Sequence, residues 1–207
     1  MTVNNPWDQR FASVQGFMYG ERPNAWIATQ LPRLGQGAEV LAVADGEGRN
    51  SVWLAQQGYQ THNWDYSSVG LAKTQRLAKQ SGVSVFTQQL DLIHDSLPEQ
   101  RFDAVVASFF HLPKRNQIEC WQRLFARLKP AGVLLVQVFD ESQLPLSSGG
   151  PKSIDLLYDR QTWQTLLRHW RIETCALVDV NLDEGLYHQG VARVINIKAY
   201  KPIEENL

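Results

Sequence analysis

The sequence predicts an α/β fold, in which a seven-stranded, mostly parallel sheet carries helices on both faces and ends in an antiparallel pair of strands. Two observations predict it. Apolar stretches of strand length alternate with stretches of helical periodicity along most of the 207 residues, which is typical of a doubly wound sheet. The last two strand-like stretches, residues 172–180 and 190–200, have no helix between them, so they should pair antiparallel.

The composition indicates a globular protein without a broadly charged surface. Hydrophobic residues make up 43% and charged residues 20% of the chain, and the net charge is −1. This charge gives no general reason to bind nucleic acid or an anionic membrane, and no apolar run approaches the length of a membrane span. The polar residues 1–5 do not resemble a signal peptide. We therefore expect a cytoplasmic protein.

The two cysteines, Cys120 and Cys175, lie far apart in the sequence. We expect them to be free thiols in a reducing compartment rather than a disulfide. No cluster of cysteine and histidine has the spacing of a zinc site, so we expect no metal.

A glycine-containing turn follows the first predicted strand. Val40 to Val43 are apolar, Gly46 and Gly48 follow, and a helix is predicted at residues 50–57. Glycines allow the backbone to approach a ligand closely, and the helix N-terminus behind them offers free N–H groups. A tight turn without a ligand is the alternative.

Asp65 supports the ligand-binding alternative. It ends a second predicted strand, residues 60–64, which should lie beside the first. An acidic side chain at this position can accept hydrogen bonds from two ribose hydroxyls. The two features together predict a nucleoside-binding crevice.

The glycine pattern fits the dinucleotide fingerprint only in part, because Ser51 stands where a third glycine is expected. The whole stretch Ala-Asp-Gly-Glu-Gly-Arg-Asn-Ser-Val-Trp-Leu-Ala instead resembles motif I of the class I S-adenosylmethionine (SAM)-dependent methyltransferases. More narrowly, it resembles the small bacterial branch that includes the tellurite-resistance methyltransferases and, more distantly, the thiopurine methyltransferases. The resemblance extends from Trp7 to Lys201 and implies a Rossmann-like fold with SAM as the cofactor.

The resemblance also implies a single domain over residues 1–207. Within it, residues 1–35 would form an N-terminal lid and a helix (25–34), residues 36–140 the SAM-binding core, and residues 141–207 an acceptor loop and a terminal hairpin. The lid would close over the methionine end of the cofactor and bring Tyr19 and Arg10 to cofactor or acceptor. The alternative is an amphipathic arm that covers one edge of the sheet.

Cofactor contacts are expected where strands end. Besides Tyr19, the resemblance implies contacts from Asp45, Gly46, Gly48, Asn50, Asp65, Tyr66, Ser67, Asp91, Leu92 and Ser108. Ser67 or Ser68 is also a natural helix N-cap, and Asp91, after a third strand at 83–86, has the alternative of an ordinary loop aspartate. One departure is Ala42, which stands where motif I usually has an acid. Either Asp45 takes over the balancing of the cofactor's ammonium group, or water does.

The middle of the chain continues the same pattern. Residues 101–108 form a continuous apolar run that resembles motif IV, and residues 116–128 form a helix with Ile118, Trp121 and Leu124 on one side. Leu-Lys-Pro-x-Gly then precedes a fifth strand at 133–139, a combination that marks class I methyltransferases.

Acceptor recognition is expected at Arg10 and Phe109 and in a flexible, turn-rich loop at 147–151, where Gly149 and Gly150 suggest a lid. A helix is predicted at 160–169. His111 and His188 are the candidate catalytic residues. Their alternatives are a histidine bonded to loop backbone and a solvated histidine in the turn at 181–189.

We therefore predict a methyltransferase that acts on a small-molecule acceptor, with no nucleic acid or membrane partner, as a monomer or homodimer. A thiolate or an oxyanion of tellurium or selenium would need no general base, whereas a hydroxyl or amine would need a histidine. A non-catalytic SAM-binding regulatory protein is one alternative. A nicotinamide-dependent oxidoreductase is the other, but no catalytic Tyr-x-x-x-Lys pair is visible.

Overall fold

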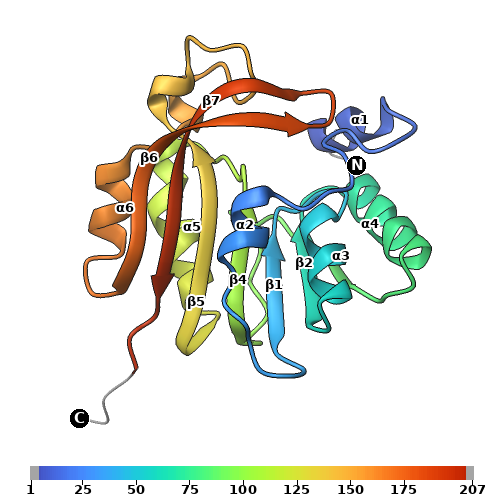
Figure 1. The fold of residues 1–207 in the computed structure, drawn as a ribbon, viewed down its shortest axis with the longest axis horizontal. Coiled ribbons are helices and arrows are strands. Elements are labelled where there is room, and N and C mark those ends of the chain that lie inside the picture. Colours follow the sequence, from blue (N-terminus) through green and yellow to red (C-terminus); the bar gives the residue numbers. More distant parts are fainter. Residues whose placement is uncertain (1–4, 204–207) are drawn as a thin grey trace.

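A computed structural model describes residues 5–203, so the polar start at residues 1–4 and the last four residues lie outside the described part. Its centre is one seven-stranded sheet in the order β3-β2-β1-β4-β5-β7-β6 (Figure 1). Strands β1 to β5 are parallel to one another, and β7 runs antiparallel to both β5 and β6. The predicted mostly parallel sheet with its antiparallel C-terminal pair is confirmed. The strands are β1 (Glu39–Val43), β2 (Gln60–Asp65), β3 (Phe86–Gln89), β4 (Phe102–Ser108), β5 (Leu128–Phe139), β6 (Arg171–Glu184) and β7 (His188–Tyr200).

Helices cover both faces of the sheet, each above its own apolar cluster. Ile27 and Leu54, from two of the helices, pack with Val40 and Leu135 on one face. Trp121 and Trp163 pack on the other face, where they join the larger cluster. The helices are α1 (Pro6–Ala12), α2 (Ala25–Gln30), α3 (Arg49–Gln56), α4 (Ser68–Gln80), α5 (Lys114–Phe125) and α6 (Arg160–Leu166), with short 3-10 turns η1 (Glu141–Gln143) and η2 (Ile154–Leu156). Thus α2 and α3 cover one face, and α5 and α6 the other.

Two element boundaries differ from prediction near the N-terminal half. Helix α2 ends at Gln30 rather than at residue 34, because Leu31 precedes Pro32 and takes an extended conformation. Strand β3 begins at Phe86 rather than at residue 83, since the backbone N–H of Val83 still bonds to Ala78 at the end of α4.

The predicted helix at 116–128 is also shifted, because Leu128 already pairs with Phe102 as the first residue of β5. Helix α5 therefore occupies Lys114–Phe125. Ile118, which was expected on the buried side, is 52% exposed. Helix α6 similarly ends at Leu166, three residues before the predicted end.

The terminal hairpin is longer than predicted. Residues 181–184 and 188–189, expected in a loop, continue the pairing of β6 with β7, so only residues 185–187 connect the strands. In Figure 1 the hairpin bends over the end of the sheet at which β1 and β5 point and reaches toward α1. It thereby covers the carboxyl ends of the parallel strands.

The N-terminal segment lies at the same end. Helix α1 packs on α4, and the Lys73 ammonium of α4 donates to the carbonyls of Phe11, Val14 and Gly16 and to the Glu47 carboxylate. The alternative of an arm along a sheet edge is therefore wrong, because the edge strands are β3 and β6. Within residues 5–203, no helix is long and apolar enough to cross a membrane, and no group of three potential metal ligands occurs.

Candidate functional site

Backbone strain marks the carboxyl ends of β1 and β4. Ala44 and Phe109, which directly follow these adjacent strands, have φ angles of 50° and 56°. Ala131 is the third non-glycine residue with positive φ in the described part of the chain. Residues held in this conformation are costly and concentrate at functional sites, so the two strand ends are the natural place to look for one.

Asp65 joins the glycine turn to the end of β2. One carboxylate oxygen accepts from the Gly46 N–H at 2.8 Å and the other from the Ser67 N–H at 2.7 Å. The side chain is almost fully buried, and this burial raises its pKa to about 6. Each oxygen keeps a second lone pair, which leaves room for the predicted ribose contact.

Asp45 does not stand free beside the turn. Its oxygens accept from the Asn50 amide at 2.7 Å and from the Ser51 N–H at 2.7 Å, which caps the first turn of α3. The carboxylate thus holds the start of the helix, and its expected role opposite the cofactor's ammonium group, with water as the alternative, stays a prediction. Gly48 has φ 90° and no space for a side chain, since a Cβ would lie 2.6 Å from Thr74 Cγ2.

Three other predicted cofactor residues have structural roles of their own. The Ser67 hydroxyl is fully buried, caps α4 at the Gly70 N–H and donates to Asp8. Asp91 accepts from the Ile93 N–H and pairs with a histidine of its own turn, in line with the loop-aspartate alternative. Leu92 belongs to the main apolar cluster. Tyr66 is half-buried, and its carbonyl accepts from the Asn5 and Gln89 amides.

A buried polar cluster lies where the hairpin meets the N-terminus of α3. We call Arg49, Glu184 and His188 the hairpin cluster. The guanidinium Nη2 of Arg49 lies 3.0 Å from Glu184, and His188 Nδ1 lies 3.1 Å from the same carboxylate oxygen. Asn24 donates to the other oxygen at 3.0 Å, and Arg49 also donates to the Ser108 hydroxyl at 3.4 Å. Three segments distant in sequence, residue 24, the start of α3 and the hairpin, therefore meet at one carboxylate.

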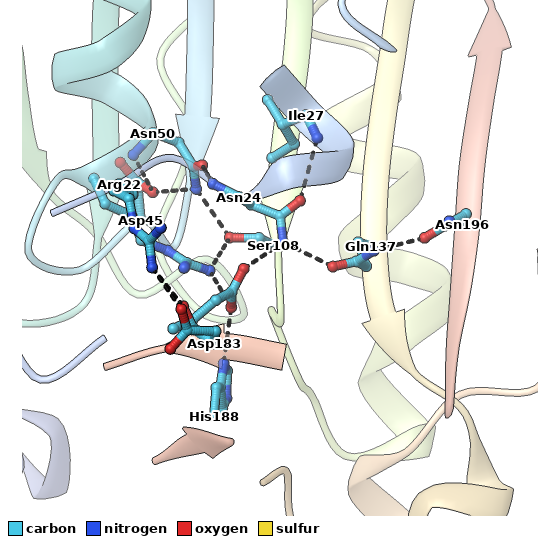
Figure 2. A network of polar contacts seen from close by, with 12 residues as sticks. Arg22, Asn24, Ile27, Asp45, Asn50, Ser108, Gln137, Asp183, His188 and Asn196 are labelled. Atoms are coloured by element: carbon cyan, nitrogen blue, oxygen red, sulfur yellow. Dashed lines mark hydrogen bonds and ion pairs between the residues drawn. The ribbon is translucent and has the colours of Figure 1, made fainter. Parts of the chain in front are cut away.

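Figure 2 shows how amide side chains extend this arrangement. Asn50 donates to both Asp45 and Ser108, which connects the glycine turn with the end of β4. On the other side, Asn24 donates to Gln137, and Gln137 donates to Asn196 across β5 and β7. The network couples the predicted cofactor turn to the hairpin through hydrogen bonds alone.

Aromatic rings surround His188. Its ring centroid lies 4.7 Å from that of Tyr19, 4.4 Å from that of Phe109 and 5.4 Å from that of Phe139. Gly149 packs directly on it, since a Cβ there would lie 2.7 Å from His188 Cδ2. His188 is only 5% exposed, so the alternative of a solvated turn histidine is wrong.

Two other predicted acceptor residues lie close by. The Arg10 guanidinium lies over the ring of Tyr187, 5.4 Å from its centroid, and Tyr187 in turn neighbours Tyr19. Gly150 packs on Phe139 as Gly149 packs on His188. The structure therefore brings together Arg10, Tyr19, Phe109, His188 and both glycines.

Both histidines bond through Nδ1, and Nε2 of His111 is likewise buried without a partner among residues 5–203, so the two differ in the acceptor that Nδ1 meets. Glu184 accepts from Nδ1 of His188, which leaves Nε2 without a partner among residues 5–203. Burial lowers the pKa of His188, against the opposing effect of Glu184, so the ring is neutral at pH 7. His111 bonds Leu156 O through Nδ1, and burial lowers its pKa to about 4. His111 thus matches its alternative, a histidine bonded to loop backbone.

Hydrogen bonds hold the loop at 147–151 in place. Gln143 donates from its side chain to the Ser148 hydroxyl and to the Gly149 carbonyl, and the Gln189 N–H donates to the Ser148 carbonyl. The predicted lid therefore closes against the hairpin in this structure, and its flexibility stays a prediction.

A groove of about 740 Å³ opens beside the cluster, between residues 19–29 and β6. Asn24, Gln137 and Glu184 line it and also belong to the network of Figure 2. The groove offers space of the size that a small molecule needs next to the hairpin cluster.

The sequence analysis did not single out Arg49 or Glu184. Both were visible in quoted motifs, Arg49 directly after Gly48 and Glu184 four residues before His188. The role of Arg49 and Glu184 depends on a contact between segments that are far apart in the chain. No local sequence pattern predicts such a contact.

Comparisons with known proteins agree with the fold. A methyltransferase-domain family matches residues 40–132. YqeM of Bacillus subtilis (strain 168), assigned as a methyltransferase, is 31% identical over 169 residues, which are 76% of this chain and 66% of YqeM. The chain thus spans slightly less than two thirds of that relative.

Two solved structures show the same fold at low sequence identity. TehB from Haemophilus influenzae is 16% identical with a TM-score of 0.66, and the match covers 79% of this chain and 57% of TehB. Magnesium protoporphyrin IX methyltransferase from Synechocystis PCC 6803, with bound S-adenosylhomocysteine (SAH), is 15% identical with a TM-score of 0.62. That match covers 80% of this chain and 74% of the other.

Proposed function

We propose that the chain is a class I SAM-dependent methyltransferase, which transfers the methyl group of SAM to a small acceptor, in the first place a thiol. The observation that carries the proposal is the meeting of the glycine turn with the hairpin cluster. Asn50 and Arg49 both contact Ser108, so the predicted cofactor turn and the buried His188–Glu184 pair share one polar network at the carboxyl ends of β1 and β4.

SAM would lie over the glycine turn. Asp65 would accept from the ribose hydroxyls, since its oxygens keep free lone pairs beside Gly46. Tyr19 and Phe109 would lie near the sulfonium, where aromatic faces favour a cation. Ser108, Tyr66 and Asp91 remain proposed contacts, the last two along the ends of β2 and β3.

His188 suits a protic acceptor. Glu184 holds the Nδ1–H tautomer, so Nε2 can take the proton of a thiol as its sulfur attacks the methyl group. The new bond joins the acceptor sulfur to the methyl carbon as the bond from that carbon to the sulfonium breaks. The charge of the sulfonium disappears, SAH leaves, and the proton resides on His188. Arg49, 3.0 Å from Glu184, keeps positive charge beside the developing thiolate.

An oxyanion of selenium or tellurium is the second candidate. It needs no general base, and Arg49 and Arg10 supply two cations on the side of the cluster that Tyr19 and Tyr187 line. The proposal in either form includes a cytoplasmic protein without a nucleic acid partner, a monomer or homodimer, and one domain with its acceptor surface in the C-terminal third.

Calorimetry with SAM, SAH and NAD is the first test, followed by transfer assays with a panel of thiols, selenite and tellurite. We expect SAM and SAH to bind, NAD not to bind, and at least one thiol to be methylated. Binding of SAH without transfer to any acceptor would favour a regulatory SAM-binding protein. Binding of NAD instead would contradict the proposal.

A further inference from the structure

Arg49 is a buried cation with one of its two terminal NH2 groups unused. Its side chain is 7% exposed. Nη2 contacts Glu184 and Ser108, but Nη1 is buried without a hydrogen-bond partner among residues 5–203. A buried donor without a partner costs about 1–3 kcal/mol, and more when the group is charged, so natural proteins seldom keep one without a use.

The neighbouring carboxylates accept hydrogen bonds from donors other than Nη1. Asp45 caps α3, Asp65 accepts from two backbone N–H groups, and Glu47 accepts from Lys73 and from the Met18 N–H. Glu184 itself is shared by Arg49, His188 and Asn24. None of these carboxylates accepts a hydrogen bond from Nη1.

The position of Arg49 relates this free group to the site. It is the first residue of α3, directly after Gly48, and its guanidinium carbon lies 6.0 Å from the ring centroid of Phe109. Gly48 is a predicted contact of the cofactor, and Phe109 is a predicted contact of the acceptor. A ligand bound in the proposed site therefore comes within reach of the guanidinium.

We propose that Arg49 is the anion-binding residue of this site, with Nη1 donating to one oxygen of a carboxylate or an oxyanion on a bound ligand. The inference rests on the proposed function only for the location of the ligand. Glu184 contributes by fixing Nη2, which aims the planar guanidinium and leaves Nη1 for the ligand. Two ligands carry such a group, namely the cofactor through its methionine carboxylate, and an anionic acceptor.

Calorimetry on the full chain separates these two sources. SAH and 5′-methylthioadenosine share the nucleoside and the thioether, but only SAH has the amino-acid carboxylate. If Arg49 holds that carboxylate, Arg49→Gln weakens SAH about 10- to 100-fold, as for a lost charge-assisted hydrogen bond, and leaves 5′-methylthioadenosine unchanged. If Arg49 holds the acceptor, SAH binds as before, while binding of selenite or sulfate to the SAH complex is lost.

Two controls separate the loss of an anion site from general damage. Arg49→Gln leaves Glu184 without its cation, so the double variant Arg49→Gln with Glu184→Gln is measured beside it and should show the same ligand selectivity. Arg171→Gln removes an exposed guanidinium that pairs with Glu173 in β6, outside the groove, and should change neither ligand.

The outcomes are distinct from those for the proposed function. Failure of the wild-type protein to bind SAH would contradict the proposed function. If the wild-type protein binds SAH, but Arg49→Gln binds SAH, 5′-methylthioadenosine and both inorganic anions as the wild type does, the anion site is refuted. Equal weakening of SAH and 5′-methylthioadenosine, without any change in anion binding, would also refute it, because the effect would then be structural.

Discussion

The glycine turn and the hairpin cluster share one network but use opposite kinds of hydrogen bond. In the turn, the carboxylates of Asp65 and Asp45 accept from backbone N–H groups. In the cluster, Arg49, Glu184 and His188 bond mainly to side chains, and both Nη1 of Arg49 and Nε2 of His188 lack a partner within residues 5–203. The turn is therefore internally satisfied, and the cluster is not.

This difference predicts different consequences for a substitution in the turn and for one in the cluster. A carboxylate that holds backbone N–H groups determines the path of the chain, so its loss should alter folding and cofactor binding together. A side chain with an unused donor or acceptor contributes little to the fold at that atom, so its loss should act on a ligand or on turnover. Each prediction below tests this separation, from the largest expected effect to the smallest.

His188→Gln should reduce methyl transfer to a thiol by about 10²- to 10⁴-fold, because it removes the proposed general base. SAH affinity should stay within about twofold, since the substitution leaves the glycine turn unchanged. The wild-type rate should fall as the pH decreases through the lowered pKa of His188, below 6.5, because protonation blocks Nε2, and the variant should lack this decrease. Steady-state assays from pH 5 to 8 measure both effects.

The exposed His169, which contacts Arg168 after α6, is a matched control, and His169→Gln should turn over normally. Wild-type turnover of His188→Gln on every acceptor would make His188 a structural residue of the hairpin and would abolish the distinction between the two regions.

Asp65→Ala should weaken SAH by about 1.5–3 kcal/mol, because it removes the proposed ribose contact, and should destabilise the fold as well. The second effect follows from the N–H groups of Gly46 and Ser67, which lose their acceptor. Calorimetry and urea unfolding measure the two effects.

Asp103→Ala provides the comparison. Asp103 accepts from the Glu39 N–H and pairs with Lys129 at the opposite end of the sheet, so its loss should lower stability and leave SAH affinity unchanged. SAH binding that persists unchanged in Asp65→Ala would remove Asp65 from the cofactor site.

Gly48→Ala should cost about 1–3 kcal/mol more than Gly58→Ala in the free energy of unfolding, measured with urea. Both glycines have φ 90°, so both substitutions carry the same backbone strain. A Cβ at Gly48 would meet the side-chain atoms of Thr74, whereas a Cβ at Gly58 would have nothing within 4 Å. Equal losses in the free energy of unfolding would mean that the turn shifts to accommodate the Cβ and is therefore not rigid.

Asp45→Asn should cost about 1 kcal/mol of stability, as for a weakened helix cap. Because the carboxylate is committed to Asn50 and Ser51, SAH and 5′-methylthioadenosine should weaken alike, if at all. Calorimetry measures the affinity of the variant for SAH and for 5′-methylthioadenosine. A loss confined to SAH would show that Asp45 does balance the ammonium group, in place of the acid missing at Ala42.

The sequence predicted the strands with the strongest burial best. Strands β1 and β4 are apolar over most of their length and lie within one residue of their predicted ranges, because a parallel strand covered on both faces leaves a largely hydrophobic run. Strand β3 is short and largely exposed, so its sequence does not distinguish it from the preceding loop. The tip of the hairpin was missed for a similar reason, since Asn181, Asp183 and Glu184 are polar but paired.

The site was predictable where it is local. Gly46, Gly48 and Asp65 lie at spacings that one strand–turn–helix–strand unit determines, and the structure brings them together. Contacts such as that of Asn24 with Glu184 join residues separated by 160 positions. Only the completed sheet creates them, and so they could not be inferred from periodicity or from motifs.

The place of β7 in the sheet has a consequence for biosynthesis. It lies between β5 and β6, although it follows both in the chain. When the ribosome has made only the residues up to the end of β6, strand β5 has an unpaired apolar edge. The reason is that Val136 and Val138 pair with Ile197 and Ile195 of β7, which follow later in the chain. Domains fold as units, and open strand edges promote aggregation. The nascent chain should therefore depend on chaperones until residue 200 has emerged.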